Sequence, residues 1–412
     1  MNFLILSVTA GEGHNSTAKA IREDLEKHDA TAEILDTFEY ISPEFAKLLA
    51  DGYLFVTEKA QGMYRIGYRL AEKRKVNEKL DVLRPVSKAL SKDLVEYINS
   101  NSCDVVIFTH PFAGMLLDTM KKKKLIRKRT VGILTDFTFH PFWEDCTAND
   151  YVVVPNRLLL PQARAKGFRD EQILPFGIPI HPKFRGTDGA DGEEVPAEIR
   201  DRARAAARET LGLCRDTNTL LVMGGSMGYG NMEELVRRID GIDTEKPFQL
   251  IAVAGRNEQM KAALDRLAEN SRHRILVTGF VDYVSTLMDA ADCIITKPGG
   301  LTTSESLAKS LPMIIVNPIP GQEERNTEFL LNNGCAMASS KTVPIEECIY
   351  QLLLSDVRLN AMRECIRLVA KPDSAGELSR FLIDLALTPR MGSYDSAGKK
   401  SGEAVPAPEA GL

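Results

Sequence analysis

The chain has 412 residues, more than the ~100–200 residues of a usual single domain, so we expect two domains. Hydrophobic residues at 44% and charged residues at 26% are typical of globular proteins, and they exclude a collagen-like, wholly disordered or disulfide-scaffold chain. The 52 basic and 57 acidic residues give a net charge of −5, which disfavours a dedicated nucleic-acid-binding protein.

Short apolar runs alternate with amphipathic stretches along the chain, which is typical of α/β domains with helices on both faces of a parallel sheet. The expected strands span residues 3–8, 32–35, 104–109, 131–135 and 151–154 in the first half, and 219–223, 249–254, 274–277, 293–296, 313–316 and 335–338 in the second. This pattern predicts two Rossmann-like domains.

Changes in composition divide the chain. Residues 184–196 are rich in Gly, Asp and Glu and precede a charged helical pattern, so they predict an interdomain linker. After residue 389 few large apolar side chains remain, which predicts a disordered tail. We therefore expect a first domain over 1–183, a linker and helix over 184–215, a second domain over 216–370, a C-terminal helix over 371–389 and the tail over 390–412.

Seven cysteines are scattered without a C-x-x-C pair, which favours a reducing cytoplasm over a zinc ribbon or a disulfide framework. The apolar run that opens the chain is too short for a signal peptide. Since no apolar stretch approaches the ~18–20 residues that span a bilayer, any membrane association is expected to be peripheral.

Residues 40–97 interrupt the alternation with a long helical stretch that is both basic and aromatic. Its cations suit contact with an anionic membrane surface, and the alternative is a solvated helix whose charges serve solubility. The cations that we assign to the membrane contact are Arg65, Arg69, Lys73, Arg74 and Lys75. A second basic run over 121–129 is the next candidate.

A Gly-rich turn that includes Gly13 and His14 follows the first strand and precedes a helical pattern over 17–27, at the sheet edge where ligands bind in open α/β folds. Glycines permit a tight turn and close approach of the backbone, and a histidine here has a pKa range suited to proton transfer. The alternative is a helix-capping turn with an incidental histidine. A dinucleotide fingerprint is excluded because Ser16 occupies the place of its third glycine.

A second Gly-rich turn follows strand 219–223, and its backbone N–H groups suit phosphate. It contains Gly224, Gly225, Ser226 and Gly228. No Lys-Ser/Thr pair follows, so a Walker phosphate loop is excluded. The alternative is a flexible loop between a strand and a helix.

Two further turns of the second half carry polar groups. Gly299, Gly300 and Thr302 begin a helix and form a second anion site, and Glu305 either favours the helix dipole or accepts both hydroxyls of a ribose. After strand 313–316, Gln322 and Glu323 lie on a polar loop that suits a polyhydroxylated ligand.

Asp136, His140 and Trp143 follow strand 131–135. Asp136 is the second candidate for a catalytic base after His14, and the alternative is a buried Asp–His hydrogen bond that orients the loop. His110 also ends a strand, and we assign it no catalytic role.

These motifs occur in the order found in one family, and together they resemble glycosyltransferase family 28, specifically monogalactosyldiacylglycerol synthases and bacterial diacylglycerol glucosyltransferases. The resemblance covers residues 1–386. It rests on Gly11-x-Gly13-His14, Thr135-Asp136-x-x-x-His140-x-x-Trp143, Phe176-Gly177-Ile178-Pro179-Ile180, Gly224-Gly225-Ser226, Lys297-Pro298-Gly299-Gly300 and Pro320-Gly321-Gln322-Glu323.

The resemblance implies a GT-B fold, in which two Rossmann-like domains face a cleft, and an inverting reaction that uses a UDP-sugar and no bound metal or cofactor. It also implies roles for residues. The turn 224–228 would hold the diphosphate, Phe280 the uracil, Glu305 the ribose, Gln322 and Glu323 the sugar, and His14 the acceptor hydroxyl. Two positions depart from the family pattern: Glu12 interrupts the three-glycine run of the plant enzymes, and residues 15–17 differ from their usual sequence after the histidine. Both departures lie in the acceptor half, so they affect acceptor geometry more than donor binding.

The expected function is transfer of a hexose from UDP-glucose or UDP-galactose to diacylglycerol, by a cytoplasmic protein peripheral on the inner face of the cell membrane. One alternative is the same fold acting on another lipid acceptor of the lipid-linked peptidoglycan precursor type. Another is a UDP-sugar sensor without turnover, which the presence of His14 disfavours. The expected partners are the UDP-sugar, diacylglycerol and an anionic membrane surface, with no nucleic acid.

Overall fold

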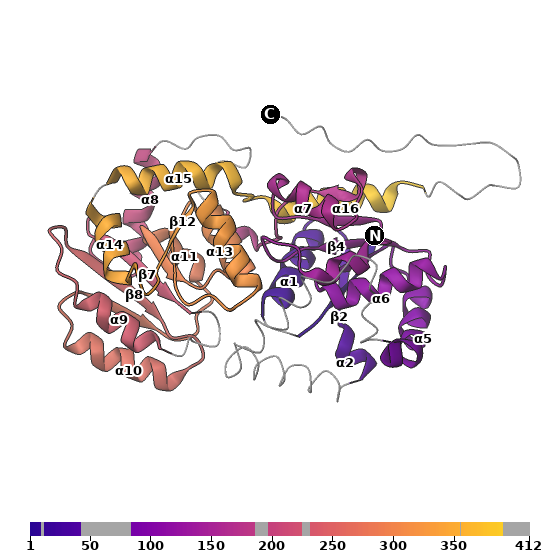
Figure 1. Ribbon diagram of the computed structural model, residues 1–412, viewed down its shortest axis with the longest axis horizontal. Helices are drawn as coiled ribbons and strands as arrows, with labels where there is room; N and C mark the ends of the chain where they lie inside the picture. Colours follow the sequence, from indigo (N-terminus) through magenta and orange to yellow (C-terminus); the bar gives the residue numbers. More distant parts are fainter. Residues whose placement is uncertain (10–11, 43–83, 186–196, 225–230, 355, 390–412) are drawn as a thin grey trace, which may run out of the picture.

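The computed structural model describes residues 1–9, 12–42, 84–185, 197–224, 231–354 and 356–389 (Figure 1). Within these residues each half of the chain forms one parallel sheet of six strands. Figure 1 shows the halves side by side, the first in indigo and magenta and the second mainly in orange. The expected α/β architecture with two Rossmann-like units is therefore confirmed.

The two sheets have related strand orders, β2-β1-β3-β4-β5-β6 and β12-β11-β10-β7-β8-β9. The first consists of β1 Asn2–Ser7, β2 Thr31–Asp36, β3 Val105–Phe108, β4 Arg129–Ile133, β5 Tyr151–Val153 and β6 Ile173–Leu174. The second consists of β7 Asn218–Met223, β8 Phe248–Val253, β9 Ile275–Thr278, β10 Cys293–Thr296, β11 Met313–Ile315 and β12 Ala336–Ala338. Each expected strand is present, and β6 was missed because two residues are too few to give a periodic pattern.

Helices cover both faces of each sheet. In the first half they are α1 Glu12–Glu26, α2 Thr37–Ile41, α5 Arg84–Ser100, α6 Pro111–Lys122 and α7 Leu160–Ala165. In the second half they are α8 Ala197–Thr210, α9 Met232–Asp240, α10 Glu258–Glu269, α11 Val284–Ala290, α12 Gly300–Ala308, α13 Gln322–Asn332, α14 Ile345–Leu354 and α15 Asp356–Val369. The last described helix is α16 Ser374–Leu387.

Alternate residues of a strand enter different cores. Phe3 and Ile5 of β1 pack with residues of α1, whereas Leu4 and Leu6 pack with residues of α5 and α6. Both faces are therefore buried, which explains why the strands read as continuous apolar runs instead of alternating with polar residues.

The C-terminal helix α16, in yellow in Figure 1, returns to the first domain, where it packs against α1. Leu378 and Leu382 are buried in the same core as Phe3 and Ile5. The guanidinium of Arg129, at the start of β4, donates hydrogen bonds to backbone carbonyls at the end of α16, where a cation complements the helix dipole. The first domain is therefore built from both ends of the described chain.

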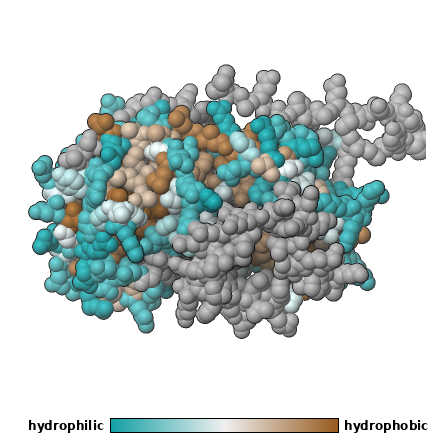
Figure 2. Space-filling model, in the orientation of Figure 1, coloured by the Kyte–Doolittle hydropathy of each residue, from teal (hydrophilic) through white to brown (hydrophobic). Residues whose placement is uncertain are grey.

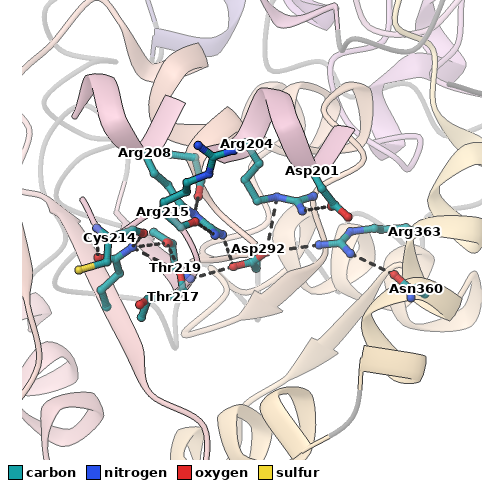
Figure 3. Close-up of polar contacts among 12 residues, drawn as sticks. Asp201, Arg204, Arg208, Cys214, Arg215, Thr217, Thr219, Asp292, Asn360 and Arg363 are labelled. Carbon is teal, nitrogen blue, oxygen red and sulfur yellow. Dashed lines mark hydrogen bonds and ion pairs between the residues drawn. The ribbon is translucent and has the colours of Figure 1, made fainter. Parts of the chain in front are cut away.

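One buried carboxylate, Asp292, forms ion pairs with α8 and α15, the helices next to the two segments where the chain passes between the domains (Figure 3). Arg204 and Arg208 of α8 reach it at 3.4 and 2.5 Å, and Arg363 of α15 reaches it at 3.7 Å. The backbone N–H of Thr219 donates to the same carboxylate at 2.8 Å. Since α8 begins and α15 ends the second domain, both of its ends are fixed to its sheet.

The visible surface of the described residues is mainly hydrophilic, with apolar patches along the upper side of the view in Figure 2. Among the described helices, none combines the length and the apolar character needed to cross a bilayer. Segments 43–83 and 390–412 and most of the expected linker lie outside the described residues. So do the five cations assigned to the membrane contact, Arg65, Arg69, Lys73, Arg74 and Lys75.

Candidate active site

The strand orders place a crevice in each sheet. From β1 the chain runs to β2 on one side and later to β3 on the other, and β7 lies in the same way between β8 and β10. Such topological switch points are where open α/β sheets bind ligands, outside the carboxyl ends of the strands. The segments that follow β1, β3, β7 and β10 contain His14, Thr109, Gly224 and Gly299.

A cavity of about 160 Å³ lies between the two domains. The first domain lines it with Gly13, His14, Thr17, Thr135 and Asp136, and the second with Gly299, Gly300, Leu301, Ile319, Gln322 and Glu323. The structure thus brings candidate residues from both halves of the sequence to one cavity.

His14 lies in the first turn of α1, which begins five residues before the expected helical pattern. Its Nδ1 lies 2.6 Å from the carbonyl oxygen of Thr109, and since a carbonyl only accepts, Nδ1 carries the proton and donates it. Nε2 is left as the basic nitrogen of the ring. Burial lowers the pKa of His14 to about 4, so the imidazole is neutral at physiological pH and able to accept a proton.

Two more histidines follow in a row, His110 beside His14 and His140 near His110, and both cap helices. His110 packs edge-on to His14, with ring centroids 4.6 Å apart, and accepts a hydrogen bond from the backbone N–H of Phe112 at 3.2 Å. His140 accepts from the N–H of Phe142 at 3.3 Å. Burial lowers the pKa of both rings, so all three histidines are neutral and do not repel one another.

The carboxylate of Asp136 faces the second domain. Its Oδ1 accepts a hydrogen bond from Asn326 at 3.0 Å and its Oδ2 one from Gln322 at 3.4 Å. Burial raises the pKa of Asp136, and the bond from Asn326 opposes this rise. Both of its oxygens therefore have partners on α13.

Two helices of the second domain begin at the cavity. Gly299 caps α12, and Gly321, whose φ of +90° suits glycine, caps α13. Unpaired N–H groups at the start of α12 attract negative charge and suit a diphosphate. The start of α13 differs, because the carboxylates of Glu323 and Glu324 already accept from the N–H groups of Ile319 and Gly321. Gly224 follows β7 in the same crevice, whereas Gly225, Ser226 and Gly228 lie outside the described residues.

Gly300 lies at a close contact between the two domains. A Cβ atom on Gly300 would overlap the carbonyl oxygen of Thr135 in the first domain, whereas a Cβ on Gly299 would have no atom within 4 Å. Only the second glycine of the pair is therefore required for the domains to approach.

Glu305 lies in the second turn of α12, three residues after Thr302. Burial raises the pKa of its carboxyl to about 8, and the nearby charge of Lys183 opposes the rise. A carboxyl in such surroundings becomes a strong acceptor once a ligand's hydroxyl groups donate to it.

Phe280 follows β9 and is 59% exposed, although it is aromatic. The guanidinium of Arg256 lies over its ring, 4.6 Å from the centroid. An exposed ring that a cation covers on one side offers a stacking surface for a planar base.

Gln322 and Glu323 both have protein partners in this structure. Gln322 donates to Asp136, as described above, and Glu323 accepts from the backbone N–H of Ile319 at 2.6 Å. Burial raises the pKa of Glu323, and Lys297 opposes this rise. Both side chains line the cavity, but they also shape the loop before α13 and its contact with the first domain.

Sequence reasoning gave no role to Thr135 or Asn326. The Oγ1 of Thr135 lies 3.4 Å from Nδ1 of His14, and Asn326 lies one helical turn after Gln322 on α13. The spacing from Gln322 was the available signal for Asn326, since residues four apart share a helix face.

Two family models match the chain in tandem. Residues 14–180 match the monogalactosyldiacylglycerol (MGDG) synthase family, and residues 219–378 match the glycosyltransferase family 28 C-terminal domain. A Bacillus pumilus protein described as a processive diacylglycerol beta-glucosyltransferase is 27% identical over 367 residues, which are 88% of this chain and 89% of that protein.

Solved structures resemble this fold over more than nine-tenths of the chain. MurG of Acinetobacter baumannii has a TM-score of 0.62 at 16% identity and covers 93% of this chain and 99% of its own. The calicheamicin glycosyltransferase CalG4 has a TM-score of 0.54 at 12% identity, with 94% and 99% covered. The expected GT-B fold is thereby confirmed.

Proposed function

The chain belongs to the glycosyltransferases that join an MGDG synthase domain to a family 28 C-terminal domain, and from this premise we propose that it moves a hexose from UDP-glucose or UDP-galactose to the hydroxyl of diacylglycerol. We further propose that the transfer inverts the anomeric carbon and needs no bound metal. The observation that carries the proposal is the position of a neutral histidine, His14, in one cavity with the starts of α12 and α13.

In the proposed reaction, Nε2 of His14 takes the proton of the acceptor hydroxyl as its oxygen attacks the anomeric carbon. Such general-base assistance commonly contributes about 10²–10⁴-fold. The bond from the anomeric carbon to the diphosphate breaks on the opposite face, so the configuration inverts. The negative charge that grows on the departing UDP is stabilised by the N–H groups at the start of α12 and in the turn after β7.

For the donor we propose the roles that the family resemblance implies. Gly224 and its turn, with Gly299, Gly300 and Thr302, would bind the diphosphate, Phe280 would stack on the uracil, and Glu305 would accept from the ribose hydroxyls. Gln322 and Glu323 would bind the hydroxyl groups of the hexose. Glucose and galactose differ only in the configuration of one hydroxyl, and this pair can contact either sugar.

The test of this function is incubation of the purified protein with diacylglycerol vesicles and radiolabelled UDP-glucose or UDP-galactose, with EDTA in a parallel reaction. We expect a labelled glycolipid from one donor or both, with equal yield in EDTA. The absence of any lipid product would refute the function, and a loss in EDTA that magnesium restores would refute only the metal independence.

Replacement of Gly300 by alanine is expected to lower kcat/KM by about 5- to 150-fold, because overpacking costs roughly 1–3 kcal/mol and here it separates the domains. Gly241→Ala is the control, since Gly241 ends α9 away from the cavity and its Cβ would meet no atom closer than 3.5 Å. Kinetics of the two variants test this, with thermal unfolding to show that both are folded. Equal activity of the two would show that close approach at Gly300 is not needed.

We also propose that the protein works at the inner face of the cell membrane and that its five candidate cations supply the contact. The second basic run, 121–129, is less suited because part of its charge already serves the fold: Lys121 and Lys122 pair with Asp150 and Asp118, and Arg129 caps α16. It also precedes β4, so it lies at the sheet edge opposite the cavity.

We expect the protein to sediment with vesicles that contain anionic lipid, and less so at high salt, because each Lys or Arg near such a surface contributes about 1 kcal/mol. A variant with glutamine at Arg65, Arg69, Lys73, Arg74 and Lys75 is expected to stay in the supernatant. Equal sedimentation of both proteins at low salt would place the membrane contact elsewhere.

A further inference from the structure

The loop that follows β4 leaves the first sheet and enters the second domain. Phe137 of this loop is 2% exposed and lies in a hydrophobic core of the second domain. Its ring centroid is 4.9 Å from that of Phe329 on α13, and Phe329 packs against cores of both domains. The loop is therefore a fixed point of contact between the domains, beside the cavity that its residues Thr135 and Asp136 line.

Asn326 of α13 binds this loop through its whole side-chain amide, which is 0% exposed. Its Oδ1 accepts from the backbone N–H of Phe137 at 2.8 Å, and its Nδ2 donates to Asp136 at 3.0 Å and to the carbonyl of Pro298 at 2.9 Å. Pro298 directly precedes the glycine pair at the start of α12. One buried amide thus ties the loop of the first domain to both donor-side helices of the second.

The same loop also reaches the candidate base. The carbonyl oxygen of Thr135 packs against Gly300, and the hydroxyl of Thr135 lies 3.4 Å from Nδ1 of His14. A continuous chain of contacts therefore runs from Asn326 through Asp136 and Thr135 to His14.

We propose that Asn326 is a positioning residue for transfer, whose amide holds loop 135–137 against the donor-side helices and so fixes the distance between His14 and the anomeric carbon of the donor. This inference rests on the proposed function, since it concerns the alignment of the same two substrates. A displacement of about 1 Å between reacting groups can cost about 10²-fold in rate, which is the size of effect that such a residue controls.

The arrangement gives Asp136 the same role. Because its two oxygens accept hydrogen bonds from Asn326 and Gln322, its carboxylate serves the contact between the domains and leaves proton transfer to His14. An asparagine at position 136 keeps one acceptor oxygen for Asn326 but cannot act as a base at neutral pH. Asp136→Asn therefore separates the two roles, whereas Asp136→Ala removes both.

The experiment compares Asn326→Ala, Asp136→Ala and Asp136→Asn with the control Asn333→Ala. Asn333 lies at the end of the same helix, and its amide donates within the second domain, to the carbonyl of Phe329 at 2.7 Å. Transfer kinetics, UDP affinity by calorimetry and amide hydrogen exchange of loop 135–137 are measured for each folded variant.

For Asn326→Ala and Asp136→Ala we expect kcat to fall by about 10²-fold with UDP affinity within threefold of wild type. Asp136→Asn is expected to keep kcat within tenfold, and Asn333→Ala to match wild type. The Phe137 amide is expected to exchange faster in Asn326→Ala only, since that variant removes its acceptor. A loss of UDP affinity equal to the loss of kcat would show a merely structural role and overturn the proposal.

The proposal would also be overturned if Asp136→Asn lost as much activity as Asp136→Ala, which would make Asp136 the base, or if Asn326→Ala matched Asn333→Ala. These outcomes need an active wild-type enzyme, so they are distinct from failure of the proposed function, in which wild type makes no glycolipid. Exchange of the Phe137 amide tests the contact between Asn326 and the loop whether or not the wild type makes glycolipid. It needs only the wild type and a folded Asn326→Ala variant, so it does not depend on the Asp136 variants.

Discussion

Alanine in place of His14 will lower kcat for hexose transfer by about 10²–10⁴-fold, the contribution that a well-placed general base commonly makes. The affinity for UDP is expected to stay at the wild-type value, because His14 belongs to the first domain and the nucleotide is proposed to bind the second. Radiolabelled transfer and calorimetry measure the two quantities. His28→Ala is the control, since His28 is exposed just beyond the end of α1.

The pH dependence gives a second test of His14. A base acts when it is deprotonated, and burial lowers the pKa of His14 to about 4. The acidic limb of kcat/KM for the acceptor, measured with the UDP-sugar saturating so that Glu305 is already charged, is therefore expected near pH 4 and not near 6.5, the pKa of an ordinary histidine. Residual turnover of His14→Ala within tenfold of wild type would remove His14 as the base.

Alanine in place of Glu305 will weaken UDP binding by about 10- to 150-fold, because each charge-assisted hydrogen bond from a ribose hydroxyl is worth about 1.5–3 kcal/mol. Glu305→Gln is expected to lie between wild type and alanine, since an amide still accepts but carries no charge. Calorimetric titration with UDP measures both. Glu328→Ala, which removes a glutamate that pairs with Arg325 on the surface of α13, is the control.

Glu305 also predicts how UDP affinity varies with pH. Its pKa of about 8 keeps the empty site largely protonated at neutral pH, whereas ribose hydroxyls favour the charged carboxylate. Binding must then release a proton, so affinity is expected to rise with pH up to about 8 and then level. Calorimetry in two buffers of different ionisation enthalpy detects that proton. If Glu305→Ala binds UDP as tightly as wild type, and wild type releases no proton on binding, then Glu305 does not accept from the ribose and only favours the dipole of α12.

The features that the sequence predicted correctly are local ones. Apolar runs such as residues 3–8 and 293–296 have both faces buried, so their hydrophobicity alone marks them as strands. The glycine pair at 299–300 marks a helix start by composition. In contrast, α1 begins at Glu12 and not at the expected Thr17. Residues 13–16 are poor helix formers, so the sequence did not predict this first turn. In the structure a hydrogen bond from Ser7 to Asn15 at 2.6 Å supports it.

The features that the sequence could not predict depend on contacts between distant segments. Asp136 and Asn326 are 190 residues apart, and neither has a local pattern that names its partner. The packing of α16 on the first domain likewise depends on where the chain crosses back, which periodicity does not contain. Candidate residues were therefore predicted from turn chemistry, whereas the connection between the two half-sites required the structure.

The most direct test of the central claim, that a base from one domain faces a UDP-sugar held by the other, is the anomeric configuration of the lipid product. UDP-glucose and UDP-galactose carry their sugars in the α configuration, and attack on the face opposite the departing UDP gives a β-glycoside. Nuclear magnetic resonance of the purified glycolipid is expected to show a single β linkage. An α-linked glycolipid would contradict the single displacement that the two half-sites are proposed to perform.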